Sequence, residues 1–294
     1  MKTKRRNEMV LQSAWKQRQT VVFLSDFGSS DGAVSAMHGV ANAVSNSLRL
    51  DDLTHEIPQF NIWEASYRLM QAMTYWASGT VFVCVVDPGV GSDRKSVVAL
   101  TESGHLIVTP DNGTLTHIAE QVGILEVRMI SEETNRLAGS QKSYTFFGRD
   151  VYAYTGARLA AGLVEFEEVG QVLPKVVKLK LEKGRVEQGK TLVGAIDILD
   201  TRYGSLWTNI SHDFLEDLGV DYGSMMQVTI TKDGRTVYGY PVQLCRNFTE
   251  VGKGAPLIYV NSLLNLAVAL NQASFSLTYG IGTGEGWKIS FSVV

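Results

Sequence analysis

Short apolar segments alternate with longer segments of helical periodicity along the first half of the chain. The short segments are rich in β-branched residues, and this alternation predicts βα units with a mainly parallel sheet. Segment 81–86, VFVCVV, is apolar throughout, which predicts a strand buried on both faces. The pattern predicts the other strands at 20–24, 49–53, 96–100, 106–108 and 125–130, and helices at 33–44, 62–76, 115–121 and 152–161.

The pattern changes after Gly170. Strand-like segments with turn signals replace the βα alternation, and Lys232-Asp233-Gly234 is typical of a hairpin turn. The predicted fold class is an α/β N-terminal domain with a mainly parallel sheet, followed by a smaller, mostly-β, barrel-like C-terminal domain. Strands are expected within 176–184, 191–199, 205–210, 225–244 and 287–294. We place a basic tail at 1–19, the α/β domain at 20–175 and the mostly-β domain at 190–294.

Composition narrows the class of protein. The 294 residues are 45% hydrophobic and 19% charged, which suffices for a core in each of two domains. No run of about 18 apolar residues occurs, and the first residues are too polar for a secretory signal. We therefore expect a soluble cytoplasmic protein with no membrane partner. A net charge of −3 argues against a nucleic-acid partner, and we interpret the basic tail as a solvated segment.

Two cysteines, Cys84 and Cys245, are too few to suggest a disulfide framework. The sequence has no CxxC motif and no Cys/His cluster, so it predicts no metal site. Cys84 lies within VFVCVV, which indicates a core position.

Three polar, glycine-containing loops follow predicted strands, at residues 25–32, 87–94 and 110–113. In parallel α/β sheets, ligands bind beyond the carboxyl ends of the strands, so these loops are the candidate site. None of them has the glycine spacing of a phosphate-binding loop. We interpret the third, Asp111-Asn112-Gly113, as a turn.

Asp26 and Asp31 put two carboxylates where a helix N-terminus would otherwise favour an anion. Hydroxyl groups or an ammonium group therefore suit this loop better than a phosphate. For Asp31, capping of the helix that begins near Ala33 is an equally good interpretation.

Asp87 follows the buried strand, and Arg94 lies seven residues later, across a Gly-Val-Gly loop. The loop can fold the guanidinium back onto the carboxylate, and such a pair can orient a water molecule. A structural ion pair would have the same spacing, so spacing alone leaves both interpretations open.

Six ordered strings extend over most of the chain from residue 20 onward: FLSDFGSSDG, THEIPQFNI, GTVFVCVVDPGVGSDRKSV, TPDNGTLT, TFFGRDVYAYTGARLAAG and AIDILDTRYGSLWTNI. In these strings the chain resembles the S-adenosylmethionine (SAM) hydroxide adenosyltransferases, relatives of fluorinase and chlorinase that were formerly known as a domain of unknown function. Members of that family use water to cleave SAM into adenosine and methionine.

The resemblance implies roles for particular residues. Asp26 would hold the ribose hydroxyls, Asp31 would lie near the methionine part of SAM, and Phe60 would pack near the ribose. Contacts with the methionine ammonium or the adenine are implied for Asp200, Tyr203, Ser205 and Trp207, and contacts with the methionine carboxylate for Asn261 and Ser262. Without the resemblance, Tyr203 and Trp207 would be interpreted as β-domain core.

The resemblance also implies an assembly. It implies a homotrimer in which the second domain of one subunit closes the site of the next, with SAM, adenosine and methionine as ligands and without metal or cofactor.

The family handles water with an Asp, an Arg and a His. Asp87 and Arg94 match the first two residues, but TFFGRD has Phe147 at the position of the histidine. A phenyl ring cannot donate, accept or titrate. Acid–base assistance contributes about 10²–10⁴-fold, so positioning alone can leave slow catalysis. His55 is the histidine nearest to a site loop in sequence, and we interpret it as structural.

Three functions are compatible with these residues. A SAM hydrolase, weakened by Phe147, is the leading hypothesis. A halide-dependent adenosyltransferase is disfavoured, because halogenases carry a tyrosine in place of Asp87 and a carboxylate repels a halide. Gly148 also replaces a halide-contacting serine of fluorinase, and the link from Leu100 to Leu106 lacks the fluorinase insertion. A protein that binds adenosine or SAM without turnover is the third hypothesis, which Phe147 supports.

Overall fold

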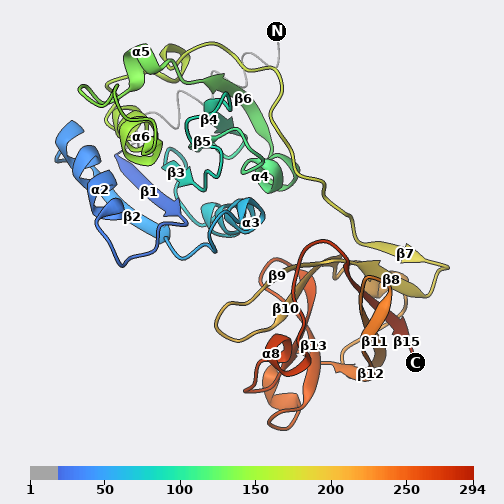
Figure 1. Ribbon diagram of the computed structural model, residues 1–294. Helices are drawn as coiled ribbons and strands as arrows, with labels where there is room; N and C mark the ends of the chain where they lie inside the picture. Colours follow the sequence, from blue (N-terminus) through green and yellow to red (C-terminus); the bar gives the residue numbers. More distant parts are fainter. Residues whose placement is uncertain (1–18) are drawn as a thin grey trace. The chain divides into compact units, whose positions relative to one another are not determined.

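The structure, a computed structural model, describes residues 19–294 (Figure 1). The chain divides into two compact units between Leu179 and Lys180. Apart from Gln19, the predicted basic tail lies outside the described residues. Within the described part of the chain, no helix is both long and apolar enough to cross a membrane.

A six-stranded mixed sheet forms the centre of the N-terminal domain, which confirms the predicted α/β class. The strand order is β2-β1-β3-β5-β4-β6. The pairs β1–β2, β1–β3 and β3–β5 are parallel, whereas β4 is antiparallel to β5 and β6. The strands are β1 (Thr20–Ser25), β2 (Arg49–Thr54), β3 (Val81–Val85), β4 (Ser96–Thr101), β5 (Leu106–Pro110) and β6 (Ile124–Met129).

Helices cover both faces of this sheet (Figure 1). Helices α2 and α6 pack together with the π-helix η1 on one face, and α3 packs with α4 on the other. The helix predicted at 152–161 begins earlier, at Gly148, as η1. The elements are α2 (Ala33–Val44), α3 (Ile62–Met73), α4 (Thr116–Gln121), α5 (Glu132–Asn135), η1 (Gly148–Ala153), α6 (Tyr154–Ala160) and the 3₁₀ turn η2 (Phe166–Glu168).

The central strands hold the core of this domain. Strand β3 is buried along its whole length, as predicted for an apolar strand between two helical layers, and Cys84 is buried within it. Phe23 of β1 belongs to the same core cluster as Met37 of α2. Gly156 lets α6 approach β3, because a Cβ atom there would lie 2.5 Å from Val83 Cγ2. This packing fixes the strand ends and the loops that follow them.

A nine-stranded curled sheet forms the C-terminal domain, which confirms the predicted mostly-β class (Figure 1). Its order is β7-β8-β15-β11-β12-β13-β14-β10-β9. The strands are β7 (Arg185–Glu187), β8 (Thr191–Gly194), β9 (Ile196–Leu199), β10 (Leu206–Ser211), β11 (Met225–Lys232), β12 (Arg235–Leu244), β13 (Pro256–Val260), β14 (Asn265–Leu270) and β15 (Trp287–Val293). The helical elements are α7 (Phe214–Asp217), η3 (Phe248–Glu250) and α8 (Phe275–Tyr279).

The hairpin predicted at Lys232-Asp233-Gly234 joins β11 to β12. Lys232 pairs with Arg235, so Asp233 and Gly234 form a two-residue turn. Their φ angles are 49° and 78°. A turn of this kind needs two left-handed residues, and Asp-Gly adopts that conformation at little steric cost.

Part of the strand prediction is wrong. Residues 176–184 form no strand. The backbone N–H of Val177 donates to Asp111 Oδ1 (2.8 Å), and that of Leu179 donates to Thr116 Oγ1 (2.9 Å). These two N–H groups therefore bond to side chains instead of to the backbone of a partner strand. The apolar pattern also missed β13 and β14. Runs as short as PLIYV and NLAVAL fit a buried helix equally well.

Candidate active site

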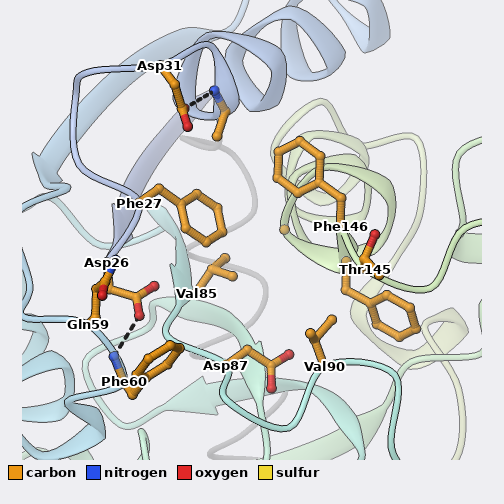
Figure 2. A pocket seen from close by; sticks show the side chains of 13 residues that line it. Asp26, Phe27, Asp31, Gln59, Phe60, Val85, Asp87, Val90, Thr145 and Phe146 are labelled. Carbon is orange, nitrogen blue, oxygen red and sulfur yellow. Dashed lines mark hydrogen bonds between the residues drawn. The ribbon is translucent and has the colours of Figure 1, made fainter.

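The loops after β1 and β3 border a pocket of about 300 Å³ (Figure 2). It lies at the carboxyl ends of parallel strands, where ligands bind in α/β sheets, and its volume is at the lower end of the range for ligand sites. Thirteen residues line it: Asp26, Phe27, Asp31, Ala33, Gln59, Phe60, Val85, Asp87, Val90, Thr145, Phe146, Phe147 and Gly148. The structure thus brings together the site residues that we predicted at positions 26, 31, 60 and 87, with Phe147 beside them.

Asp26 is held at one side of the pocket. It directly follows β1, and its Oδ2 accepts a hydrogen bond from the backbone N–H of Phe60 (2.8 Å). Phe60 has a φ of 65°, which is strained for an aromatic residue, and its side chain is 65% exposed. Strained residues cluster at binding sites, and an exposed ring at a pocket edge is suited to contact a ligand.

Asp31 lies at the pocket edge and also bonds the start of helix α2. Its Oδ1 accepts a hydrogen bond from the backbone N–H of Ala33 (2.8 Å), in the first turn of the helix. Gly32 is the N-cap residue itself, so Asp31 bonds the first helical residue from the position before the cap. Because Asp31 also lines the pocket, this hydrogen bond does not exclude contact with a ligand.

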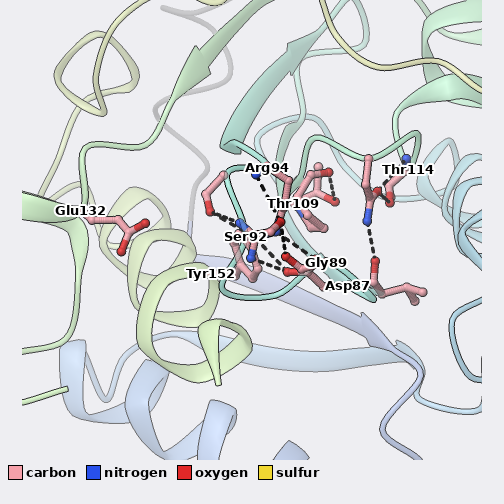
Figure 3. A network of polar contacts seen from close by, with 12 residues as sticks. Asp87, Gly89, Ser92, Arg94, Thr109, Thr114, Glu132 and Tyr152 are labelled. Carbon is pink, nitrogen blue, oxygen red and sulfur yellow. Dashed lines mark hydrogen bonds and ion pairs between the residues drawn. The ribbon is translucent and has the colours of Figure 1, made fainter. Parts of the chain in front are cut away.

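Asp87 and Arg94 form a bidentate ion pair (Figure 3). Arg94 Nε donates to Asp87 Oδ1 (2.9 Å), and Nη2 donates to Oδ2 (2.5 Å). The side chains are 10% and 6% exposed, for Arg94 and Asp87 respectively. This fork-to-fork geometry fixes the plane of the carboxylate. The loop therefore folds back as its spacing predicted, and the pair presents one fixed carboxylate to the pocket.

Tyr152 and Ser96 extend this network, and sequence reasoning missed both. Ser96 Oγ accepts from Arg94 Nη1 (2.9 Å) and lies 3.1 Å from Tyr152 Oη. Tyr152 Oη donates to Asp87 Oδ2 (3.4 Å). Burial raises the pKa of Tyr152, and the nearby Asp87 raises it further, so the phenol stays a proton donor. Helical periodicity assigns Tyr152 to the core, and its hydroxyl contact appears only in the fold.

Phe147 is packed beside the ion pair. The ring is 5% exposed, and the guanidinium carbons of Arg94 and Arg136 both lie 4.9 Å from its centroid. Arg136 is itself held by Glu132 (2.5 Å) and by the Ser143 carbonyl. The ring thus supplies cation–π contact and apolar volume to two arginines.

A second group of predicted residues gathers in the C-terminal domain. Asp200 Oδ1 accepts from the backbone N–H groups of Arg202 (3.1 Å) and Tyr203 (3.2 Å), which closes the turn before β10. Trp207 Nε1 donates to Tyr259 Oη (3.0 Å), and Ser205 also hydrogen-bonds Tyr259. Trp207 of β10 and Tyr259 of β13 both pair with Ala267 of β14, which lies between these strands. Sequence reasoning missed Tyr259, because β13 was not predicted.

Asn261 and Ser262 lie on the turn after β13. Asn261 Oδ1 accepts from the backbone N–H groups of Leu263 (2.9 Å) and Asn265 (3.1 Å). Its Nδ2 is buried and has no hydrogen-bond partner among the described residues. A buried donor without a partner is uncommon, so this amide is available to a ligand. Ser262 is exposed.

Comparisons with known proteins identify the family. The SAM hydroxide adenosyltransferase N-terminal domain matches residues 21–170, and the SAM hydroxide adenosyltransferase C-terminal domain matches residues 194–288. The chain belongs to the SAM hydroxide adenosyltransferase family.

Relatives of this family member include proteins with two different names. An (R)-S-adenosyl-L-methionine hydrolase of Methanocaldococcus jannaschii is 37% identical over 197 residues, 66% of this chain and 67% of the relative. A fluorinase of Actinopolyspora mzabensis is 25% identical over 94% of this chain and 98% of its own. The crystal structure of an uncharacterized conserved protein from Thermotoga maritima has a TM-score of 0.84 at 32% identity, over 92% of this chain and 99% of its own.

Two histidines of this family member are poor replacements for the histidine that the resemblance implies at position 147. Burial lowers the pKa of His105 and of His117 to about 4, so both imidazoles are weak proton acceptors. His117 Nδ1 lies 2.9 Å from Ser66 Oγ, and neither histidine is among the residues that line the pocket.

Removing Arg94 should destabilise the N-terminal domain by about 3–5 kcal/mol, because Arg94→Ala leaves a nearly buried carboxylate without its counter-ion. Adding Asp87→Asn should recover part of that loss. Urea denaturation of the full chain, with both single variants and the double variant, measures the coupling. Arg185→Ala is the control, since its pair with Glu187 is exposed and should contribute little. Additive losses from the two single changes would contradict the coupling.

Proposed function

We propose that this protein hydrolyses SAM to adenosine and methionine. The observation that carries the proposal is the Asp87–Arg94 pair, which presents a fixed carboxylate to a pocket lined largely by apolar side chains. Membership of the SAM hydroxide adenosyltransferase family supports the substrate and the nucleophile. Relatives named as (R)-S-adenosyl-L-methionine hydrolases support the same reaction.

The reaction makes few demands on the leaving group. Water oxygen forms a bond to the ribose C5′, the C5′–S bond breaks, and its electron pair returns to sulfur. The sulfonium becomes the neutral thioether of methionine, so no proton has to be delivered to it. The attacking water loses one proton, which leaves the site as H⁺. Catalysis therefore depends on aligning the water and accepting its proton.

Asp87 is suited to hold the attacking water. Its carboxylate is oriented by Arg94 and Tyr152, and each oxygen retains acceptor capacity beyond those hydrogen bonds. Phe27, Val85 and Phe146 line the same pocket and limit access of bulk water. The carboxylate would repel a halide, so this geometry disfavours a halide nucleophile.

The other predicted site residues bind the substrate in this proposal. Asp26 accepts from the ribose hydroxyls while its Oδ2 remains bonded to Phe60, whose ring packs near the sugar. Asp31 lies near the methionine part. In the C-terminal domain, Asp200, Tyr203, Ser205 and Trp207 contact the methionine ammonium or the adenine, and Asn261 and Ser262 contact the carboxylate.

Three further expectations belong to the same proposal. The reaction uses no cofactor, because a sulfonium is already an activated leaving group. The protein acts in the cytoplasm. It assembles as a homotrimer, in which the C-terminal group of one subunit completes the pocket of the next.

Incubation with SAM should release adenosine and methionine in equal amounts, together with one proton per turnover. Asp87→Asn should lower the rate by about 100-fold or more, because the amide accepts no proton. Asp93→Asn, an exposed residue of the same loop, is the matched control and should keep the parent rate. Chromatography of the products checks this. SAM binding without products would overturn the proposal in favour of a binding protein, and a nucleoside formed only with added halide would favour a halide-dependent transferase.

Phe147→His should raise the hydrolysis rate by about tenfold or more, the lower part of the range for acid–base assistance. Arg94 and Arg136 lie beside this position and disfavour a second positive charge, so the imidazole should be a neutral proton acceptor. Phe146→His is the control, since it places an imidazole in the same pocket at a position that does not match the family histidine. Equal rates for the parent and Phe147→His would contradict this role.

The trimer is tested by sedimentation equilibrium of the full chain, which should give a mass of three chains. Mixing Asp87→Asn subunits with Trp207→Ala subunits should restore activity if each site combines residues of two subunits. A monomeric mass, or failure of the mixture to recover any activity, would contradict shared sites.

A further inference from the structure

A second polar cluster lies outside the pocket, at the edge of the N-terminal sheet. It consists of His38 on α2, Asp52 on the edge strand β2, and His55 just after that strand. Asp52 Oδ1 lies 2.8 Å from His38 Nε2 and 2.9 Å from His55 Nε2. The three potential ligand atoms all lie within 4.8 Å of one another. Two imidazoles and one carboxylate thus converge on one point.

His55 has the contacts of a supported metal ligand. Its side chain is 8% exposed, and its Nδ1 lies 2.7 Å from Ser25 Oγ. Metal-bound imidazoles are held in this way by a second polar group on the other ring nitrogen. His55 Nε2 is buried and lies 2.9 Å from Asp52 Oδ1. This buried ring nitrogen is therefore aimed at the cluster.

His38 and Asp52 leave one side of the cluster open. Their side chains are 30% and 40% exposed, respectively, so an ion can enter from solvent. The His38 ring is also oriented by Phe23, with ring centroids 4.8 Å apart. Bonds of about 2.0–2.1 Å to a tetrahedral ion would place the ligand atoms about 3.3 Å apart. Small side-chain adjustments suffice to reach that spacing.

We propose that His38, Asp52 and His55 form a binding site for a divalent transition metal, with Zn²⁺ the best match. Two imidazoles, one carboxylate and one open position are a donor set that Zn²⁺ accepts, whereas Mg²⁺ and Ca²⁺ prefer oxygen ligands. With a metal on Nε2, His55 Nδ1–H donates to Ser25 Oγ. The site lies outside the residues that line the pocket, and it does not rest on the proposed hydrolysis.

The position of this site gives it a structural role. The backbone carbonyl of His55 accepts from the N–H of Gly28 (2.8 Å), within the loop that carries Asp26 and Asp31. Ser25 directly precedes Asp26. A metal would therefore tie α2 and the end of β2 to the loop that borders the pocket. It should stabilise the N-terminal domain without contacting the reacting atoms.

The test uses the full chain without an affinity tag, after treatment with chelator. Co²⁺ is added first, because its visible absorption reports tetrahedral nitrogen and oxygen ligands, and Zn²⁺ is then added to displace it. Calorimetry with Zn²⁺ alone gives affinity and stoichiometry. The variants are His38→Gln and Asp52→Asn, and melting in EDTA must first show that both fold like the parent. His212→Gln is the matched control, because His212 lies 3.5 Å from Asp213 in a pair that no third potential ligand joins within residues 19–294.

The parent should bind one Zn²⁺ per chain and melt at a higher temperature with Zn²⁺ than in EDTA. His38→Gln and Asp52→Asn should each weaken binding by about tenfold or more and remove the increase in melting temperature. His212→Gln should behave as the parent. Unchanged affinity in the two ligand variants, or no saturable binding by the parent, would overturn the proposal whether or not the protein hydrolyses SAM.

Discussion

A carboxylate and a guanidinium that are both almost withdrawn from water determine how this pocket is built. Burial of either charge alone would be strongly unfavourable, so Asp87 and Arg94 must meet in a geometry that satisfies both. The loop between them folds back to permit this. Ser96 accepts from the remaining guanidinium nitrogen, and Tyr152 is a further donor to the carboxylate. The orientation of the carboxylate is therefore a consequence of electrostatics, and the proposed chemistry uses that orientation.

A histidine at position 147 could contribute both packing and acid–base chemistry, whereas Phe147 contributes packing alone. Its ring keeps the volume and the cation–π contact that Arg94 and Arg136 need, so the ion pair retains its shape. The ring supplies no proton acceptor, so in the proposed hydrolysis alignment of water and removal of its proton depend on Asp87. The phenyl ring fills this position, whereas it cannot take part in acid–base chemistry.

The opposite side of the pocket depends on a different set of contacts. Asp26 holds Phe60 in a strained conformation, and the His55 carbonyl holds Gly28 in the neighbouring loop. Ser25 connects this loop to the His38–Asp52–His55 cluster through one hydrogen bond. The edge of the sheet and the edge of the pocket are thus parts of one polar network, in which the proposed metal would replace the two contacts between Asp52 and the imidazoles with coordinate bonds.

The sequence by itself determined the features that depend on near neighbours. Uniform apolarity identified β3, Asp233-Gly234 identified the hairpin, and the positions of Asp26 and Asp87 after strands identified the pocket loops. Tertiary structure alone decided contacts between distant segments: Tyr152 on Asp87, Tyr259 beside Trp207, and His38 beside Asp52 and His55. Local patterns report burial and turn geometry over a few residues, whereas these contacts depend on strand order and on how each helix packs on the sheet.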